Sequence, residues 1–144
     1  MIEIRSSTVN DSEAIRNLSV QLGYQPTLDT VISGLEAMAK TEGYEVVVIT
    51  QNNVVAGWMS LGVRLRIEDV PFFEVLAIVT DEAKRGSGFG KALMRYAEAN
   101  AHEKNIPLVL LYSNVIREES HKFYNRVGYQ KYKQAFLFRR NIGE

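Results

Sequence analysis

Apolar and polar positions recur with different periods along the chain, and each period predicts one kind of element. Residues 2–5 alternate and predict a short strand. Asn10, with Glu three residues later, is typical of a helix start, and residues 14–22 then place apolar side chains at helical spacing. Thr27 starts a second helical pattern, which ends near Gly43. The N-terminal part therefore predicts a strand followed by two helices.

The middle of the chain predicts a hairpin and a central strand. Residues 46–49 form a short β-branched run. Asn52 and Asn53 tolerate the left-handed backbone that a tight hairpin turn needs, so we expect residues 54–67 to return antiparallel. Residues 72–79 are apolar on both faces, which is typical of a strand in the interior of a sheet.

The rest of the chain returns to helical spacing and then alternates again. We expect a helix from Gly88 to about residue 101, a strand over 108–112, a helix over 117–127 and a final strand over 129–140. The predicted order is strand, helix, helix, three strands, helix, strand, helix, strand. Because three strands follow one another without helices between them, this is an α/β (α+β) fold and not a doubly wound one.

The composition is that of an ordinary globular protein. The chain has 144 residues, of which 46% are apolar and 24% charged, with 17 Lys and Arg against 17 Asp and Glu. This length favours a single domain over residues 1–144. The balanced charge speaks against nucleic acid or a membrane as a partner, and no apolar run is long enough to span a bilayer. Because the N-terminus carries no secretory pattern, we expect a cytoplasmic protein.

The chain has no Cys, which excludes disulfides, thiolate zinc sites and thiol nucleophiles. Its two histidines, His102 and His121, are not spaced as metal ligands. We therefore expect no metal.

A glycine-rich segment between the central strand and the third helix carries the clearest chemical signal: Arg85, Gly86, Ser87, Gly88, Phe89, Gly90 and Lys91. Glycines at alternate positions let the backbone turn and present its amides, and the helix that follows adds its dipole. With a basic residue at each end, the segment suits a phosphate or pyrophosphate. The alternative is a flexible surface turn with a helix cap.

Three other motifs do not fit. A Walker A loop needs Gly at position 85 and Ser or Thr at position 92, where the chain has Arg85 and Ala92. The dinucleotide fingerprint needs Gly where Lys91 stands. A nucleophile elbow around Ser60 needs Gly where Trp58 stands.

The pattern Arg85-x-x-Gly88-x-Gly90 resembles the (Gln/Arg)-x-x-Gly-x-(Gly/Ala) motif of the GCN5-related N-acetyltransferases, also between the fourth strand and the third helix. Residues 113–129 resemble the family's segment that ends in Phe-Tyr-x-x-x-Gly-(Phe/Tyr). The resemblance covers essentially the whole chain and reaches towards a small-molecule, aminoglycoside-type subgroup. It implies a mixed, mostly antiparallel sheet of about six to seven strands flanked by four helices. It also implies an acetyl-CoA-dependent N-acetyltransferase.

The resemblance assigns roles to particular residues. The backbone of Ile78, Val79 and Thr80 would pair with the pantetheine arm of acetyl-CoA, where the fourth and fifth strands separate. The amides of residues 85–91 would hold the pyrophosphate. Tyr124 matches the family's tyrosine near the thioester sulfur.

Tyr124 would assist the leaving group. Attack by an amine expels a CoA thiolate, whose conjugate acid has a pKa of about 8.5 by analogy with Cys, whereas a tyrosine hydroxyl is near 10. A positioned phenol can hydrogen-bond to that thiolate and protonate it. Core packing beside Phe123 and Val127 is the alternative.

The acceptor amine must lose a proton, and Glu74 is the candidate base. An amine with a pKa of about 10.4 is neutral in only about one molecule in two thousand at pH 7. Glu74 is the one carboxylate in the apolar run 72–79 and lies eleven residues before Arg85, similar to the catalytic glutamate of members that have one. It could instead accept a structural hydrogen bond, and a water chain is another route for the proton.

Arg117 stands where the family most often has Asn, seven residues before the tyrosine. The resemblance implies a CoA phosphate or another anionic group as its partner, and pairing with Glu118 or Glu119 is the alternative. We expect His121 to be a solvated or packing residue rather than a base.

Acceptor specificity in this fold lies in the first two helices and the loop between the third and fourth strands, here residues 21–38 and 64–73. Candidates for an acidic and aromatic rim around a cationic amine are Tyr24, Glu36, Glu42, Glu68 and Asp69. A small-molecule amine is the expected acceptor, with a peptide amine as a further class. With no Cys, transfer to the amine would be direct. A non-catalytic acyl-CoA sensor is the alternative function, and a homodimer is one option for the assembly.

Overall fold

The computed structural model describes residues 1–143 of the chain. The chain forms two compact units, Met1–Tyr112 and Ser113–Glu144. Within the described residues, no helix is long and apolar enough to cross a membrane.

The first unit is built on a five-stranded mixed sheet in the order β1-β2-β3-β4-β5. Neighbouring strands from β1 to β4 are antiparallel, whereas β5 is parallel to β4. The strands are Ile2–Ser6 (β1), Tyr44–Gln51 (β2), Val54–Arg64 (β3), Phe72–Thr80 (β4) and Val109–Leu111 (β5). The predicted run of three consecutive strands is therefore confirmed as β2, β3 and β4.

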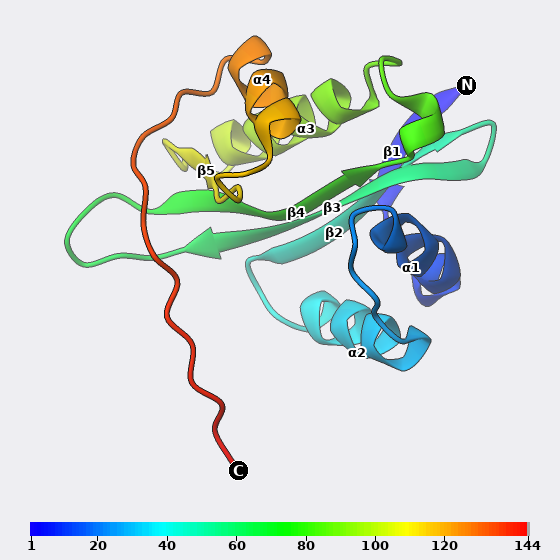
Figure 1. The fold of residues 1–144 in the computed structure, drawn as a ribbon, viewed down its shortest axis with the longest axis horizontal. Helices are drawn as coiled ribbons and strands as arrows, with labels where there is room; N and C mark the ends of the chain where they lie inside the picture. Colours follow the sequence, from blue (N-terminus) through cyan, green and yellow to red (C-terminus); the bar gives the residue numbers. More distant parts are fainter. Residues whose placement is uncertain (144) are drawn as a thin grey trace. The chain divides into compact units, whose positions relative to one another are not determined.

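Helices cover both faces of this sheet, as Figure 1 shows. α1 (Ser12–Val20) and α2 (Leu28–Ala39) lie on one face, and α3 (Phe89–Glu103) lies on the other. α1 packs against β3 and β4, α2 against β2, and α3 against β3, β4 and β5. Two short 3-10 helices, η1 (Val9–Asp11) and η2 (Glu82–Lys84), precede α1 and α3.

The main core lies between the sheet and α3. Glu45 of β2 accepts hydrogen bonds from the Tyr96 hydroxyl at 2.8 Å and from the Asn100 amide at 2.7 Å, both on α3. Because side chains alternate along a strand, Val47 and Ile49 point to the same face, and both are fully buried. Burial, together with the bond to Glu45, raises the pKa of Tyr96 to about 12, so its hydroxyl remains a donor at neutral pH.

Local signals in the sequence explain several boundaries. Asn52 and Asn53 adopt φ of 51° and 67°, which confirms the predicted tight hairpin. Thr27 caps α2, as predicted, by accepting a hydrogen bond from the amide three residues on at 3.1 Å. The predicted start of the first helix at Asn10 is wrong, since η1 occupies that position and α1 begins at Ser12.

The second unit contains α4 (Glu118–Arg126). Within its described residues no strand forms over 129–140, so the predicted final strand is wrong, and the sheet has five strands rather than six to seven. The alternation is present, but strand amides and carbonyls need a partner strand, and this unit supplies none. Phe136, Leu137 and Phe138 are accordingly 90%, 98% and 91% exposed.

Candidate active site

An open backbone edge runs along the second half of β4. The pairing of β4 with β5 spans residues 73–75, whereas β4 itself continues to Thr80. Beyond residue 75, the described residues give β4 a partner strand on the β3 side alone (Figure 1). Ile78, Val79 and Thr80, the predicted pantetheine contacts, lie on this open edge.

A β-bulge marks the point where β4 and β5 separate. Ser60 of β3 aligns with Ala77, but its neighbour Leu61 aligns with Val75, which leaves Leu76 as an extra residue in β4. A bulge bends its strand and increases the local twist. The bulge therefore lies directly after Val75, which pairs with Leu111, the last residue of β5.

The predicted glycine segment forms the turn from β4 into α3. Gly86 and Gly88 have φ of 87° and 84°, a region that residues with a Cβ rarely adopt. Gly88 caps α3, and the first helical hydrogen bond runs from the Ala92 amide to the Gly88 carbonyl at 3.0 Å. The amides of residues 89–91 precede that bond and have no acceptor within the helix. They lie at the positive end of the helix dipole, which suits an anion.

The side chains of this segment divide into two groups. Arg85, Ser87 and Lys91 are exposed, so the two basic residues can reach an anion from solvent. Phe89 is only 3% exposed and packs into the core. Phe89 thus fixes the start of α3, and only its backbone is available to a ligand.

Two glutamines anchor the chain just before the glycines. Gln21, which caps the end of α1, accepts a hydrogen bond from the Glu82 amide at 2.9 Å and donates one to Asp81 at 3.3 Å. Gln51 accepts a hydrogen bond from Lys84 Nζ at 3.1 Å. The base of the glycine turn is therefore tied to both α1 and β2.

Glu74, the predicted base, is held by an arginine. Arg64 Nε donates to Glu74 Oε1 at 2.8 Å, and Arg64 Nη1 donates to the Tyr44 hydroxyl at 2.6 Å. The hydrogen bond to Glu74 raises the pKa of Arg64 above its ordinary value, so the guanidinium is charged. The Glu74 side chain is 14% exposed, and Oε2 takes no hydrogen bond from any described residue. One oxygen is thus fixed and the other is available.

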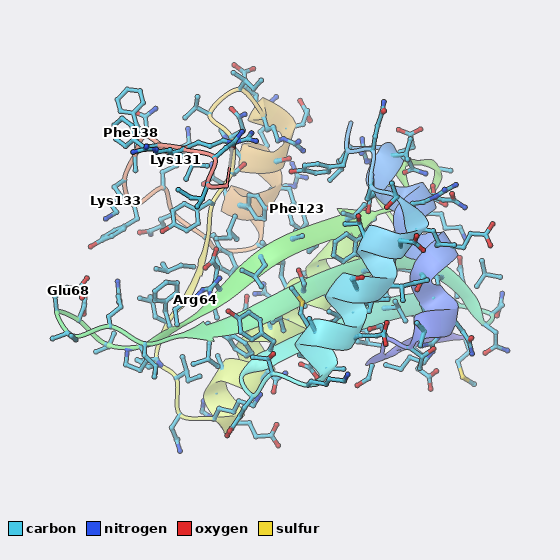
Figure 2. All side chains as sticks on the ribbon, turned by 90° about the horizontal axis from the view of Figure 1, so that it is seen from below. Arg64, Glu68, Phe123, Lys131, Lys133 and Phe138 are labelled. Carbon is cyan, nitrogen blue, oxygen red and sulfur yellow. The ribbon has the colours of Figure 1, made fainter. Side chains whose placement is uncertain are left out.

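Two acids of the predicted rim, Glu68 and Asp69, lie in the loop between β3 and β4. Figure 2 shows Glu68 at the tip of this loop, away from Arg64 at its base. Asp69 lies 3.6 Å from Arg66 and accepts a hydrogen bond from the Val70 amide at 2.7 Å. These contacts tie Asp69 to two residues of its own loop, Arg66 and Val70.

The remaining predicted site residues belong to the second unit. Burial raises the pKa of Tyr124 and the positive charge of Arg117 lowers it, with burial the larger effect. The Tyr124 ring packs edge-on against Phe123, with centroids 5.3 Å apart. His121 Nε2 donates to the Asn114 carbonyl at 3.0 Å, a contact that holds the turn before α4.

The acetyltransferase (GNAT) domain model matches residues 42–131, which is more than half of the chain. The chain belongs to the GNAT acetyltransferase family. It is therefore an acyltransferase, and the matched segment includes the bulged strand, the glycine turn and α4.

Curated relatives of this GNAT protein carry N-acetyltransferase names. It is 26% identical over 116 residues to an uncharacterized N-acetyltransferase of Bacillus subtilis, YhdJ, with 80% of each chain covered. It is also 26% identical over 135 residues to the aminoalkylphosphonate N-acetyltransferase of Salmonella typhimurium, covering 90% of this chain and 85% of that one.

Solved structures share the fold. The aminoglycoside N-acetyltransferase AAC(6')-Iy in complex with CoA has a TM-score of 0.87 at 16% identity, over 97% of this chain and 95% of that one. A putative acetyltransferase from Agrobacterium tumefaciens has a TM-score of 0.84 at 24% identity, over 96% and 99% of the two chains. The α+β GNAT fold is thereby established for this chain, with five strands and four α-helices among its described residues.

The sequence did not point to four side chains that make these contacts around Glu74 and the glycine turn: Tyr44, Arg64, Gln21 and Gln51. A signal existed for the first two, because assigning the register of β2, β3 and β4 places them on the same face as Glu74. The glutamines gave no signal, since each lies far from its partner in sequence. Among residues 1–143, no three His, Cys, Asp or Glu side chains are grouped so that they could hold a metal ion.

Proposed function

We propose that this protein transfers the acetyl group of acetyl-CoA directly to a primary amine of a small molecule. The observation that carries the proposal is the open edge of β4, which begins at the Leu76 bulge and leads to a turn with two left-handed glycines. The free backbone groups of residues 78–80 suit the amides of a pantetheine arm. The amides of residues 89–91, with Arg85 and Lys91, suit the pyrophosphate.

Two side chains would move protons. Glu74 Oε2 takes a proton from the acceptor ammonium, which frees the nitrogen lone pair. That nitrogen then forms a bond to the thioester carbonyl carbon, and the carbon–sulfur bond breaks. Tyr124 gives its hydroxyl proton to the departing thiolate. The acylated nitrogen loses its remaining extra proton through water to the tyrosinate, which restores the hydroxyl, and Glu74 releases its proton to solvent. Because burial raises the pKa of Tyr124, its hydroxyl retains that proton at neutral pH until the thiolate forms.

The acceptor class is proposed from the names of relatives. An aminoalkylphosphonate N-acetyltransferase and an aminoglycoside N-acetyltransferase both act on small amines by name. The chain has no Cys, so no cysteinyl intermediate is available and the acetyl group would pass directly to nitrogen. Arg117 at the start of α4 is a candidate partner for a CoA phosphate, since no described residue forms an ion pair with it.

The test combines binding with turnover. Acetyl-CoA should raise the melting temperature by mass action, and no shift at millimolar acetyl-CoA would contradict the proposal. Release of free thiol is then followed with a panel that includes aminoalkylphosphonates, aminoglycosides, simple alkyl amines and a lysine peptide. Thiol release with a small amine supports the enzyme. A thermal shift with no release on any amine would support an acyl-CoA sensor instead.

A further inference from the structure

We propose that Arg64 is a positioning residue for Glu74, and that Tyr44 holds Arg64 in place. The inference rests on the proposed role of Glu74 as the base. It extends that role by stating what directs the carboxylate towards the acceptor.

The three side chains lie on neighbouring strands and on one face of the sheet. Tyr44 of β2 aligns with Gly62 of β3, and Gly62 aligns with Glu74 of β4. Arg64 follows Gly62 by two residues and therefore projects from the same face. The three polar side chains thus form a row across β2, β3 and β4.

Gly62 makes this arrangement possible. A Cβ at that position would lie 2.9 Å from Tyr44 Cε1, closer than side-chain carbons approach one another. The Tyr44 ring therefore occupies the space that a side chain at position 62 would fill. From there its hydroxyl reaches Arg64 Nη1 at 2.6 Å, and the Arg64 guanidinium carbon lies 5.5 Å from the ring centroid.

Arg64 binds one carboxylate oxygen of Glu74 and leaves the other oxygen free. The bond from Nε fixes Oε1, so the carboxylate cannot rotate freely, while Oε2 stays open to an acceptor ammonium. On either side Glu74 aligns with Gly62 and Leu110, neither of which titrates or competes for Oε2. A base that is already oriented avoids the cost of being ordered during the reaction.

Stability and positioning can be separated by experiment. The Arg64 side chain is 36% exposed and that of Glu74 14%, so removing Arg64 leaves a largely buried carboxylate without its partner and lowers the melting temperature to some extent. The melting temperature of each variant is therefore measured together with its kcat. A matched control is available in Arg95, which pairs with Glu98 at 2.7 Å on the surface of α3.

The experiment compares Arg64→Gln, Arg64→Lys and Tyr44→Phe with Arg95→Gln. Arg64→Gln should lower kcat at least about tenfold, with the KM for acetyl-CoA and the acetyl-CoA thermal shift unchanged. Arg64→Lys should recover part of kcat, Tyr44→Phe should be intermediate, and Arg95→Gln should match the wild type.

Equal kcat values for Arg64→Gln and Arg95→Gln would overturn the inference. If Glu74→Gln is inactive at the same time, the proposed base stands and only the role of Arg64 fails. Full activity of Glu74→Gln would remove the base and the inference together. A crystal structure of Arg64→Gln gives an answer that does not depend on turnover: the Glu74 carboxylate should leave its wild-type position, and an unmoved carboxylate contradicts the proposal.

Discussion

Gly88 is the single residue on which the proposed pyrophosphate site depends most directly. Its φ of 84° starts α3 with its first amides facing outwards, and a Cβ there would meet no atom within 4 Å. That open space is where the proposed pyrophosphate would lie. Gly88→Ala should therefore abolish most of the thermal shift produced by acetyl-CoA, measured by differential scanning fluorimetry.

The control for this variant is Gly23→Ala. Gly23 has a φ of 90° and also lacks neighbours within 4 Å of a Cβ, so both substitutions carry the same left-handed strain of about 1–2 kcal/mol. Both variants should lose similar stability without ligand. If the two keep equal shifts with acetyl-CoA, the glycine turn does not hold the pyrophosphate.

Tyr124 allows a second test at the level of one atom. Tyr124→Phe removes the hydroxyl but keeps the ring that packs against Phe123 at 5.3 Å. If the hydroxyl protonates the thiolate, kcat should fall by about 10²–10⁴-fold in thiol-release assays. The acetyl-CoA thermal shift should stay at the wild-type value.

Tyr132→Phe, at a position 78% exposed in the same unit, serves as the comparison and should be unchanged in kcat. Loss of the thermal shift together with turnover in Tyr124→Phe would make Tyr124 a structural residue. Unchanged turnover would assign protonation of the thiolate to another group.

Among the elements, the sequence predicted those features that depend on a few adjacent residues. These are the turn at Asn52 and Asn53, the cap of α2 by Thr27, and the start of α3 at Gly88. The ion pair between Arg64 and Glu74 was not predicted. The two residues are ten positions apart in the sequence and meet only through the pairing register of β3 and β4. The final strand failed for the opposite reason: alternation was present, but a strand also needs a partner that alternation does not specify.

The joint between β1 and α1 gives a pH-dependent prediction. Arg5 donates to both oxygens of Asp11 at 2.9 Å, and the Thr8 amide donates to Oδ2 at 2.8 Å. The bonds from Arg5 outweigh the effect of burial and lower the pKa of Asp11. Folding therefore favours the ionised carboxylate. This stabilisation is present above the ordinary Asp pKa of about 3.9 and is lost as pH falls through the lower pKa of the folded state.

Asp11→Asn should lower the free energy of unfolding by about 1–3 kcal/mol at pH 7, measured by urea denaturation. The gap between wild type and variant should narrow as pH falls below about 4. Glu119→Gln, which removes an exposed ion pair with Lys122, should differ little from wild type at pH 7. A gap for Asp11→Asn that is constant down to pH 2 would show that charge plays no part in this joint.

For the whole molecule, equal numbers of acidic and basic residues conceal a local division. Arg85 and Lys91 are exposed at the open end of the glycine turn, whereas Arg5, Arg64 and Arg95 are each paired with a carboxylate. A net charge of zero is therefore compatible with one site for an anionic cosubstrate. Overall charge predicts only that nucleic acid is not the main partner, whereas the pairing pattern separates the paired arginines from Arg85 and Lys91, the proposed contacts of the pyrophosphate.

The apolar segment after α4 leads to a prediction about assembly. Phe136, Leu137 and Phe138 are consecutive and at least 90% exposed, and neighbouring exposed apolar side chains are candidates for an interaction surface. We expect a homodimer that buries these side chains, detected by sedimentation velocity over a range of concentrations. Since burying one such side chain contributes about 1.5–3 kcal/mol, the double variant Phe136→Ser/Phe138→Ser should weaken dimerisation more than a hundredfold. Val54→Ser, at a single apolar position 60% exposed on the β2–β3 hairpin, should leave it unchanged. A wild-type protein that sediments as a monomer at every concentration would exclude this role for the segment.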